Sequence, residues 1–310
     1  MSATNFVAAD VGNARIKLGL FQDDCAARLP EPVRTLALVG KPELDRIRPW
    51  LEKGGLEKGD SPHLCEAPIG PFRQMGTVPF FPGEGLTWWI ASVNRPAATR
   101  LIDWLHKHRP ADRVVLLACG DLPLAVRLDR PDMVGIDRLV DAVAVNRLRD
   151  VGRPAVIVDV GTAITVDLVS ADGVFLGGAI LPGIQMSARA LHHFTDLLPL
   201  VDVAELAAPP PALGDATESA MQSGLFWGAV GAIRQLIEQL CKAATRDRVE
   251  KGGTSTAAPA HVFLTGGAGA AVAELLGRET HYVPNLTLSG IARIALEHKA
   301  RGTAKPGCST

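Results

Sequence analysis

Charge of one sign, paired cysteines and long apolar runs are all scarce in this sequence. Its 32 lysine and arginine residues nearly balance 33 aspartate and glutamate residues, so the formal net charge is −1. Such a balance gives no support to binding of nucleic acids or anionic membranes, which usually leaves a basic footprint. The five cysteines are odd in number, scattered and without Cys-x-x-Cys spacing. They therefore indicate reduced thiols rather than a disulfide framework or a zinc site.

Membrane and export signals are also lacking. The longest stretch without a charged side chain, residues 252–273, is rich in Gly, Ser, Thr and Pro, and it predicts loop and strand rather than a membrane span. The first ten residues have neither the basic nor the apolar region of a signal peptide. We therefore expect a cytoplasmic protein that binds neither membranes nor nucleic acids.

The sequence does contain a mixed pattern of strands and helices. Its 310 residues, 47% of them hydrophobic, suffice for one large domain or two ordinary ones. The first part predicts a helix near 96–108 and an irregular Gly- and Pro-rich insertion near 54–86. Strands are expected near residues 5–10, 15–21, 34–39, 88–93 and 113–118.

The second part repeats this alternation. Its first helix is expected over 134–150, with one apolar face made of Ile136, Leu139, Val140, Val143 and Leu148. A long helix over 217–241 carries an apolar stripe together with Phe226 and Trp227, which is more apolar surface than one face needs. The remaining elements are expected as strands near 155–160, 163–169 and 174–181, a helix near 183–193, the strand "HVFL" and the helix "LSGIARIALEHK".

The same acidic turn occurs twice, in "FVAADVGNARIKLGLF" at 6–21 and in "VIVDVGTAITVDLV" at 156–169. Asp10 and Asp159 each end an apolar strand, where a charge is costly unless it is used. Gly12 and Gly161 follow two residues later and let the backbone approach a ligand, and clustered N–H groups of such turns bind anions. Two ordinary hairpins with Asp as a turn former are the alternative. The recurrence of the turn, with a later "TGG", favours Mg²⁺–nucleotide chemistry in a duplicated architecture with a cleft between its halves.

These segments resemble a known family. "DVGN" followed by Lys17, "DVGTAIT" and "LTGGAG" look like the two phosphate motifs and the adenosine motif of the actin, Hsp70 and sugar-kinase superfamily. "VGIDR" at 134–138, "GGAILPG" at 177–183, and the run from "LHHFTDLLPLV" to "GDATESAMQSG" narrow the resemblance to type III pantothenate kinases. The order and spacing match along nearly the whole chain, apart from the insertion and the C-terminal tail.

The resemblance implies a fold and an activity. The fold would be α/β, with two similar actin/ribonuclease H-like domains, over 1–130 and 131–310, and a nucleotide cleft between them. The activity would be ATP-dependent phosphorylation of pantothenate to 4′-phosphopantothenate, the first step of coenzyme A biosynthesis. The family uses ATP with Mg²⁺ and a monovalent cation, K⁺ or NH₄⁺, and forms homodimers, so the same is implied here, with Thr217 near the subunit boundary.

The resemblance also assigns roles to single residues. Asp137 would be the general base, Asp159 would bind the monovalent cation, and Asp10 would lie near the Mg²⁺ bound to phosphate. The ATP-binding residues would be Asp10, Val11, Gly12, Asn13, Ala14, Arg15, Ile16, Lys17 and Thr162. The substrate-binding residues would be Gly135, Ile136, Asp137, Arg138 and Thr217.

Elementary chemistry agrees with these roles. Phosphorylation of a primary hydroxyl needs a carboxylate that accepts its proton, and it needs positive charge around the transferring phosphoryl group. Arg138 could bind a substrate carboxylate. By itself, the pair Asp137–Arg138 is also compatible with an acidic helix start beside a solvated arginine. Its place within the ordered motifs favours the functional interpretation.

Two positions depart from the family pattern. Ala14 stands where Thr or Ser is common, so a hydroxyl contact to phosphate is lost while the backbone N–H remains. Leu128 stands where an aromatic residue often precedes the G-x-D-R motif. Two alternatives to a pantothenate kinase follow from the same fold: a non-catalytic transcriptional regulator, or a superfamily kinase for another small hydroxy acid. The four retained residues Asp10, Asp137, Asp159 and Thr162 argue against the regulator.

Overall fold

Two sheets with the same topology make up the frame of the protein. The computed structural model describes residues 5–23, 27–40, 43–52, 85–203, 208–250, 252, 259–277 and 280–303. The insertion predicted near 54–86 lies almost wholly outside the described residues. The first sheet has the order β3-β2-β1-β4-β5. Its strands are β1 (Phe6–Val11), β2 (Arg15–Phe21), β3 (Arg34–Val39), β4 (Thr87–Ser92) and β5 (Arg113–Leu116).

The second sheet repeats the first strand for strand. Its order is β8-β7-β6-β9-β10, and each sheet joins an antiparallel three-stranded meander to two parallel strands. Its strands are β6 (Ala155–Val160), β7 (Ala163–Val169), β8 (Phe175–Pro182), β9 (His261–Thr265) and β10 (Thr280–Tyr282). The duplicated architecture expected from the two acidic turns is therefore present at the level of whole sheets.

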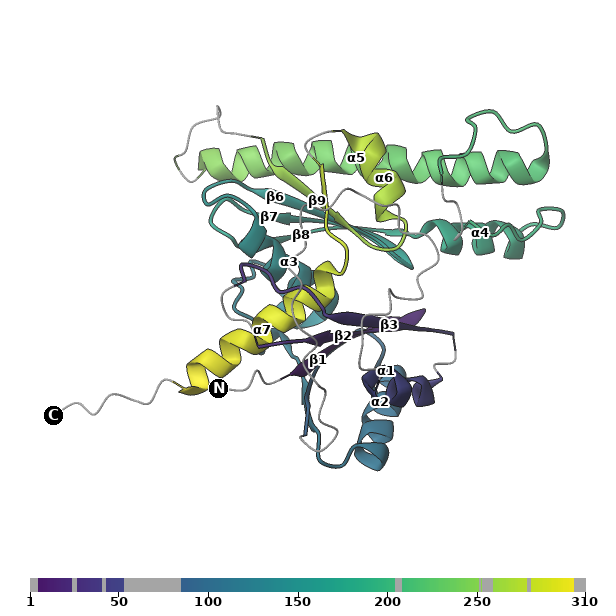
Figure 1. Ribbon diagram of the computed structural model, residues 1–310. Helices are drawn as coiled ribbons and strands as arrows, with labels where there is room; N and C mark the ends of the chain where they lie inside the picture. The colour runs from purple at the N-terminus through teal and green to yellow at the C-terminus, as the bar shows by residue number, and fades with distance from the viewer. Residues whose placement is uncertain are drawn as a thin grey trace, which may run out of the picture.

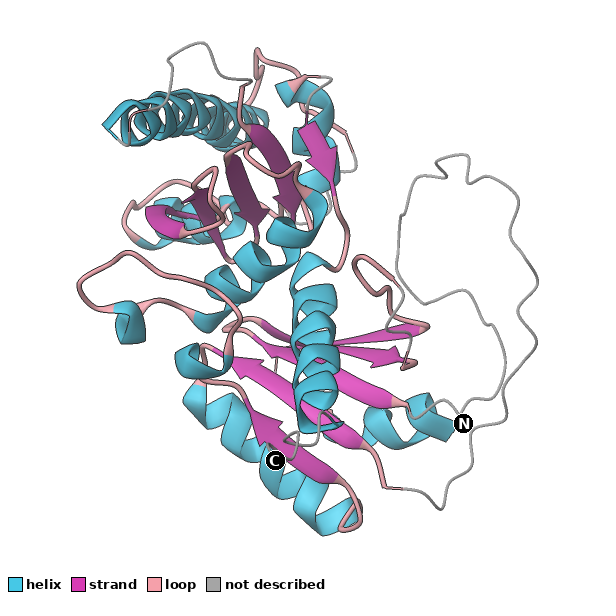
Figure 2. Ribbon diagram, turned by 90° about the vertical axis from the view of Figure 1, so that its left-hand side faces the viewer, coloured by secondary structure: helices cyan, strands magenta, loops and turns pink. Residues whose placement is uncertain are grey.

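Helices form three layers around these sheets. Figure 1 shows α5 above the second sheet, α1 and α2 below the first sheet, and α3 and α7 between the sheets. Figure 2, from the side, shows the same stacking. The bounds of the helices are α1 (Ile47–Glu52), α2 (Arg95–His108), α3 (Ile136–Leu148), α4 (Ile184–His193), α5 (Thr217–Glu250), α6 (Gly269–Leu276) and α7 (Leu286–Thr303). Short 3₁₀ turns cover Leu44–Arg46, Cys119–Asp121 and Pro131–Met133.

The strand pattern explains why both faces of each sheet are covered. In β1, Phe6 and Ala8 point to the central layer, whereas Val7 and Ala9 point to the outer layer with α2. A strand with apolar residues on both faces is stable only when both faces are packed. The central layer is built from α3 and α7, and α7 packs on β1, β2 and β4 of the first sheet although it follows the second sheet in sequence.

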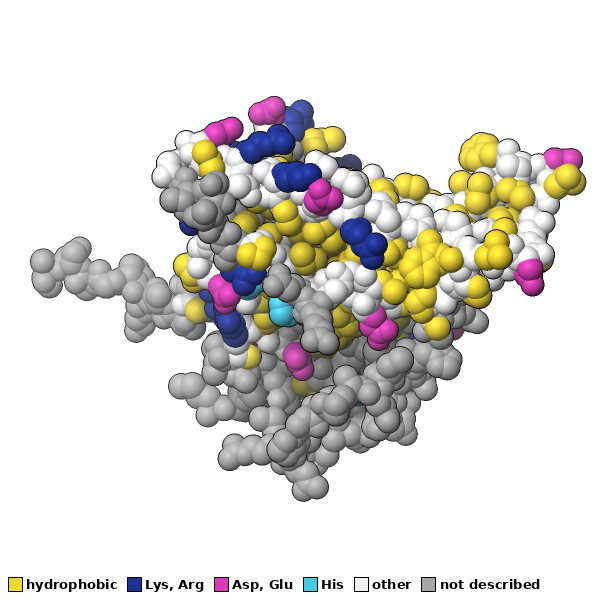
Figure 3. Space-filling view, turned by 90° about the horizontal axis from the view of Figure 1, so that it is seen from above, with side chains coloured by type: hydrophobic (Ala, Val, Ile, Leu, Met, Phe, Trp, Pro, Cys, Tyr) yellow, Lys and Arg dark blue, Asp and Glu magenta, His cyan; other side chains and the backbone are white. Residues whose placement is uncertain are grey.

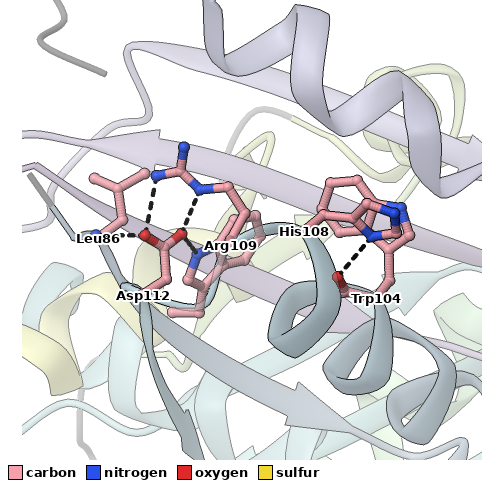
Figure 4. A network of polar contacts seen from close by, with 6 residues as sticks. Leu86, Trp104, His108, Arg109 and Asp112 are labelled. Carbon is pink, nitrogen blue, oxygen red and sulfur yellow. Dashed lines mark hydrogen bonds and ion pairs between the residues drawn. The ribbon is translucent and has the colours of Figure 1, made fainter. Parts of the chain in front are cut away.

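A polar network fixes the connection between α2 and the first sheet. The carboxylate of Asp112 accepts hydrogen bonds from the backbone N–H of Leu86 at 2.9 Å and from the indole N–H of Trp88 at 2.8 Å. Arg109 donates to the same carboxylate through Nε and Nη2, at 2.8 and 2.9 Å (Figure 4). A buried carboxylate with four donors is fully satisfied, so this network is structural.

No helix among the described residues is long and apolar enough to span a membrane.

Candidate active site

The first acidic turn joins β1 to β2, and the two strands place a lysine opposite the aspartate. Asp10 lies opposite Lys17 in the ladder, and the Lys17 Nζ is 3.8 Å from the Asp10 Oδ2. The Asp10 side chain is only 14% exposed. Burial raises its pKa to about 6, against the opposing effect of Lys17 and with further increases from Asp137 and Asp159. Asp10 therefore lies close to both other carboxylates that the sequence singled out.

The turn itself offers fewer backbone donors than its glycine suggests. The N–H of Gly12 donates to the Arg15 carbonyl at 3.0 Å, so it is used within the turn. The side chains of Val11 and Ile16 are buried in the outer core, which leaves them only backbone groups for a ligand. Among the described residues, the N–H groups of Asn13 and Ala14 have no backbone acceptor, and both residues are exposed. They are the donors that an anion could use.

The second acidic turn joins β6 to β7 and is packed more tightly. Asp159 lies opposite Thr165, and the N–H of Gly161 donates to the Ala163 carbonyl at 3.0 Å. Burial is the main cause that raises the pKa of Asp159, and Lys17 lowers it. A Cβ on Gly266 would lie 2.5 Å from an Asp159 carboxylate oxygen, so only glycine fits there. Thr162 is exposed at the tip of the turn.

The beginning of α3 presents Asp137 between the two turns. The carboxylate of Asp137 accepts a hydrogen bond from the backbone N–H of Arg138 at 2.8 Å, and burial raises its pKa. A Cβ at Gly135 would lie 2.6 Å from Asp137 Oδ1, which explains the glycine of the G-x-D-R motif. Ile136 is buried in the central core, so its side chain anchors the helix start rather than facing a ligand.

Arg138 is already engaged by a buried carboxylate. Its Nε lies 3.1 and 3.0 Å from the two carboxylate oxygens of Asp167, and its Nη2 also pairs with Asp167. The guanidinium stacks over Phe175 at 5.7 Å from the ring centroid. Asp167 is 2% exposed on β7 and lies in the stretch "TVDLV", where an acid inside an apolar strand was the signal for it. The remaining nitrogen, Nη1, has no hydrogen-bond partner among the described residues.

A second carboxylate that sequence reasoning missed lies one turn along α3. Asp141 is 3% exposed, and its Oδ1 has no hydrogen-bond partner among the described residues. Burial and the nearby charge of Asp159 raise the pKa of Asp141 well above its usual value, while a hydrogen bond from Thr287 lowers it. Its signal in the sequence was its i+4 spacing from Asp137, which puts both on one helix face.

These carboxylates form a dense acidic centre, but not a preformed metal cage. Among the described residues, no group of three or more His, Cys, Asp or Glu side chains is placed to hold a metal ion. Carboxylate oxygens are suitable ligands for a hard cation, and a cation would relieve the repulsion between the buried acids. The remaining ligands of such a cation would be water or substrate oxygens. Mg²⁺ usually keeps several waters and binds substrate phosphates, so one or two protein carboxylates suffice for it.

One residue singled out in the sequence lies apart from this centre. Thr217 is the exposed first residue of α5. In Figure 1, α4 and the beginning of α5 project together beyond the second sheet, away from α3. We call α4, residues 194–200, residues 208–216 and the first turns of α5 the arm. Within one chain, the structure does not bring Thr217 to Asp10, Asp137 and Asp159.

The arm exposes apolar side chains. Phe194 is 81% exposed and Leu197 is 87% exposed, and Leu200 and Leu213 are also exposed. Figure 3 shows apolar side chains gathered over this projecting part. By contrast, Phe226 is buried and the Trp227 indole donates to the Pro210 carbonyl at 3.0 Å. Phe226 is therefore covered within the chain and Trp227 is half-buried against the same core, whereas the strongly exposed apolar side chains lie on the arm.

Comparisons with known proteins agree with the motif order. The family model for type III pantothenate kinase matches residues 74–239. A type III pantothenate kinase of Ruegeria sp. (strain TM1040) is 37% identical over 181 residues, which cover 58% of this chain and 63% of the relative. One of Koribacter versatilis (strain Ellin345) is 34% identical over 235 residues, which cover 74% of this chain and 77% of the relative.

The matched region does not extend over whole relatives in every case. The chain spans 63%, 61% and 64% of the length of three type III pantothenate kinases that it matches. Among solved structures, a Campylobacter jejuni protein of the Baf family of transcriptional activators superposes with a TM-score of 0.52 at 18% identity, over 95% of this chain and 100% of that one. At this identity, the likeness shows the fold alone.

Proposed function

The chain belongs to the type III pantothenate kinase family, and we propose that it transfers the γ-phosphoryl group of ATP to the primary hydroxyl of pantothenate. The observation that carries the proposal is the position of Asp137. It lies at the start of α3, close enough to raise the pKa of Asp10 in the first turn and that of Asp159 in the second. A hydroxyl bound between the turns would have its base beside it.

The raised pKa of Asp137 suits a general base. Burial of its carboxylate raises this pKa above the usual value for aspartate, and the adjacent N–H and guanidinium of Arg138 oppose that increase. A base whose pKa lies closer to the operating pH accepts a proton more effectively. Asp137 would take the proton from the attacking hydroxyl oxygen as that oxygen bonds to phosphorus.

The first turn would hold the phosphates. The exposed N–H groups of Asn13 and Ala14 and the ammonium of Lys17 line it. Mg²⁺, bound through phosphate oxygens near Asp10, would neutralise charge on the transferring group. Thr162 at the tip of the second turn would add a hydroxyl. We further propose that Asp159 helps hold a monovalent cation, K⁺ or NH₄⁺, which predicts activation by these ions and little activity in Na⁺ or Tris alone.

Pantothenate would lie along the start of α3. Gly135 leaves space beside Asp137, and the Nη1 of Arg138 would bind the substrate carboxylate while Asp167 holds the rest of the guanidinium. This arrangement differs from a mobile surface arginine, because the fork is fixed before the substrate arrives. Fixing a charged group in advance lowers the entropy lost on binding.

Thr217 would complete the substrate site from a second copy of the chain. Its place on the arm, which also carries the exposed side chains of Phe194, Leu197 and Leu213, supports a homodimer in which two arms bury these side chains. A two-fold interface uses the same patch on both subunits. Light scattering at micromolar concentration should give the dimer mass, and Leu197→Asp should shift it to the monomer with loss of activity. A strictly monomeric and fully active wild type would contradict the dimer.

The kinase proposal is tested with ATP and pantothenate as the only substrates. Asp137→Asn keeps the size of the side chain but cannot accept the proton, so we expect kcat to fall by about 10²-fold or more. Asp132→Asn, which changes an exposed aspartate just before α3, is the matched control and should keep wild-type turnover. Near-normal turnover of Asp137→Asn would contradict the assignment of the base.

The same assay, together with the ATP-dependent change in melting temperature, separates the alternatives. A wild type that binds ATP but leaves pantothenate unphosphorylated would favour a kinase for another small hydroxy acid. A wild type that shows neither activity nor an ATP-dependent change in melting temperature would favour a regulator.

A further inference from the structure

One oxygen of Asp141 is buried without a partner. The side chain lies on α3, one turn after Asp137, and it is 3% exposed. Thr287, at the beginning of α7, donates a hydrogen bond to the carboxylate, whereas Oδ1 has no hydrogen-bond partner among the described residues. Leaving a buried polar atom unsatisfied costs free energy, and the cost is greater for a charged group. The free oxygen therefore marks a place where the described part of the chain supplies neither a donor nor a cation.

The alternation of side chains in β6 turns Asp159 toward the same helix. Ile157 of β6 packs in the central core, to which α3 contributes Leu139 and Val143. Asp159 comes two residues later, and side chains two positions apart in a strand leave the sheet on the same face. Its carboxylate thus faces the layer that contains α3, and no hydrogen bond or ion pair joins it to another described residue. Asp141 and Asp159 therefore face one region, one from the helix and the other from the sheet.

The electrostatics of Asp141 agree with this arrangement. Burial is the main cause that raises its pKa, and the charge of Asp159 comes next, ahead of the charges of Asp137 and Asp10. A hydroxyl belongs to the same face, because Thr265 of β9 is the ladder partner of Asp159 and is only 3% exposed. Oxygen atoms from α3, β6 and β9 thus converge, and a hard cation prefers such ligands.

We infer that Asp141 is a second carboxylate ligand of the monovalent cation and holds it from α3 while Asp159 holds it from β6. The inference rests on the proposed function, which assigns the cation to Asp159. K⁺ would be coordinated by one oxygen of each carboxylate, by the Thr265 hydroxyl and by water, and NH₄⁺ would donate hydrogen bonds to the same oxygens. The bound cation would also join α3, which carries Asp137, to the second acidic turn.

Thermal melting of the full chain without substrates tests this. KCl is raised at constant ionic strength, with choline chloride as the balancing salt. A cation that binds only the folded state raises the melting temperature by mass action, so wild type should show a saturating rise with K⁺ or NH₄⁺ and a much smaller one with Na⁺. Asp141→Asn keeps an acceptor for Thr287 but loses the charge, so the half-saturating K⁺ concentration should increase by about tenfold or more. Asp103→Asn, which changes an exposed aspartate on α2, is the control and should respond like wild type.

Melting in choline chloride alone separates a cation ligand from a structural acid. Without K⁺, Asp141→Asn should melt at or above the temperature of wild type, because it removes a buried acid with an unpartnered oxygen beside another acid. An acid that serves only as an acceptor for Thr287 would leave the half-saturating K⁺ concentration unchanged on substitution, and that result would overturn the inference.

A double variant tests whether the two carboxylates serve one cation. Asp159→Asn should itself weaken or abolish the response of the melting temperature to K⁺. Adding Asp141→Asn in that background should then have little further effect, because residues that act on one ligand are not additive. Two full and additive effects would mean two separate sites and would contradict a shared cation.

The remaining outcomes distinguish the two proposals. If wild type responds alike to K⁺, NH₄⁺ and Na⁺ in melting and in activity, the proposed cation at Asp159 fails. If wild type responds to K⁺, Asp159→Asn does not, and Asp141→Asn behaves like wild type, the role of Asp141 fails while the cation at Asp159 stands. In steady-state assays, Asp141→Asn should raise the K⁺ concentration for half-maximal activity by about tenfold or more, in parallel with the melting response.

Discussion

The two acidic turns are alike in burial and different in charge. Strands β1 and β6 share one burial pattern residue by residue, and so do β2 and β7. Yet Asp10 lies opposite Lys17, whereas Asp159 lies opposite Thr165. The first turn is also one residue longer, because Val11 pairs with Ile16 and Val160 pairs with Ile164. Both halves therefore share the same pattern of buried residues and an acid at the end of a strand, but only the first half has a lysine opposite that acid.

The loops that pack against the two turns also differ. Gly183 and Gly266 press against the second turn, where an added Cβ would lie 2.4 Å from backbone oxygens. Within the turns themselves the space is alike, because the nearest atom to an added Cβ lies at 3.4 Å for Gly12 and at 3.6 Å for Gly161. The second turn is therefore packed closely by two neighbouring loops, whereas Asn13 and Ala14 at the tip of the first turn are exposed. We propose that the first turn, where Lys17 faces Asp10, would make the charge contacts to a nucleotide and that the second would supply a rigid wall.

The largest expected effect separates catalysis from stability at the first turn. Asp10→Asn removes the carboxylate proposed to serve Mg²⁺, so phosphorylation should fall by about 10²- to 10³-fold, the scale of a lost electrostatic contact to the transition state. The variant should still fold, with a melting temperature equal to or above that of wild type. Initial rates and melting curves on the same preparation measure both. A lower melting temperature with activity in proportion to folded protein would mean that the turn is purely structural.

The next effect concerns the rigidity of the second turn. Gly266 has φ of +95°, and a Cβ there would lie 2.4 Å from the Val160 carbonyl oxygen. Gly266→Ala should lower the free energy of unfolding by about 2–4 kcal/mol, since strain and a backbone clash add. Gly12→Ala, at a position where the nearest atom to an added Cβ lies at 3.4 Å, is the comparison and should change it by less than about 1 kcal/mol. Urea unfolding of both variants gives the values, and equal losses would show that the two turns are packed alike.

A smaller effect appears in the pH dependence of stability. The pKa of Asp10 is about 6 in the folded chain against 3.8 for the free group. Well below pH 3.8 the carboxyl is protonated in both the folded and the unfolded chain, so it has no effect on stability. The folded state then loses stability as the pH rises from 3.8 through about 6. The full shift corresponds to about 3 kcal/mol, and losing the attraction to Lys17 offsets part of the gain in Asp10→Asn. The stability of Asp10→Asn relative to wild type should therefore increase between pH 4 and pH 6.5. A difference that is independent of pH would contradict the raised pKa.

The smallest expected effect comes from making the first turn resemble the second. Lys17→Thr copies the residue opposite Asp159 and removes a pair whose atoms are 3.8 Å apart. Partly exposed pairs of this kind contribute about 0–1 kcal/mol, so the free energy of unfolding at pH 7 should change within that range. Because the charge of Lys17 lowers the Asp10 pKa, this pKa should rise in the variant, and the loss of stability should extend to higher pH. An NMR titration of the Asp10 carboxyl would show no upward shift if Lys17 did not act on it.

Local pattern was enough to predict most elements and their ends. The strands expected at 15–21 and 163–169 coincide with β2 and β7, because a glycine turn and an apolar run delimit each one. The expected face of α3 is buried at Ile136, Leu139, Val140 and Val143. The helix expected to end near 241 continues to Glu250, because charged residues with good helix propensity extend it after the apolar stripe stops.

The sequence by itself therefore determined the repeated strand–turn–strand units, the family, and the acids at the ends of two buried strands, since each depends on residues within a short stretch. Only the tertiary structure decided which groups meet. Asp167 holds Arg138 from 29 positions away, α7 returns to the first sheet, and Arg15 rests on Gly267. Such contacts depend on how two whole sheets stack around α3 and α7, which no local spacing encodes. The charges in the first turn are visible in the sequence, whereas their orientation toward the second half is a property of the folded chain.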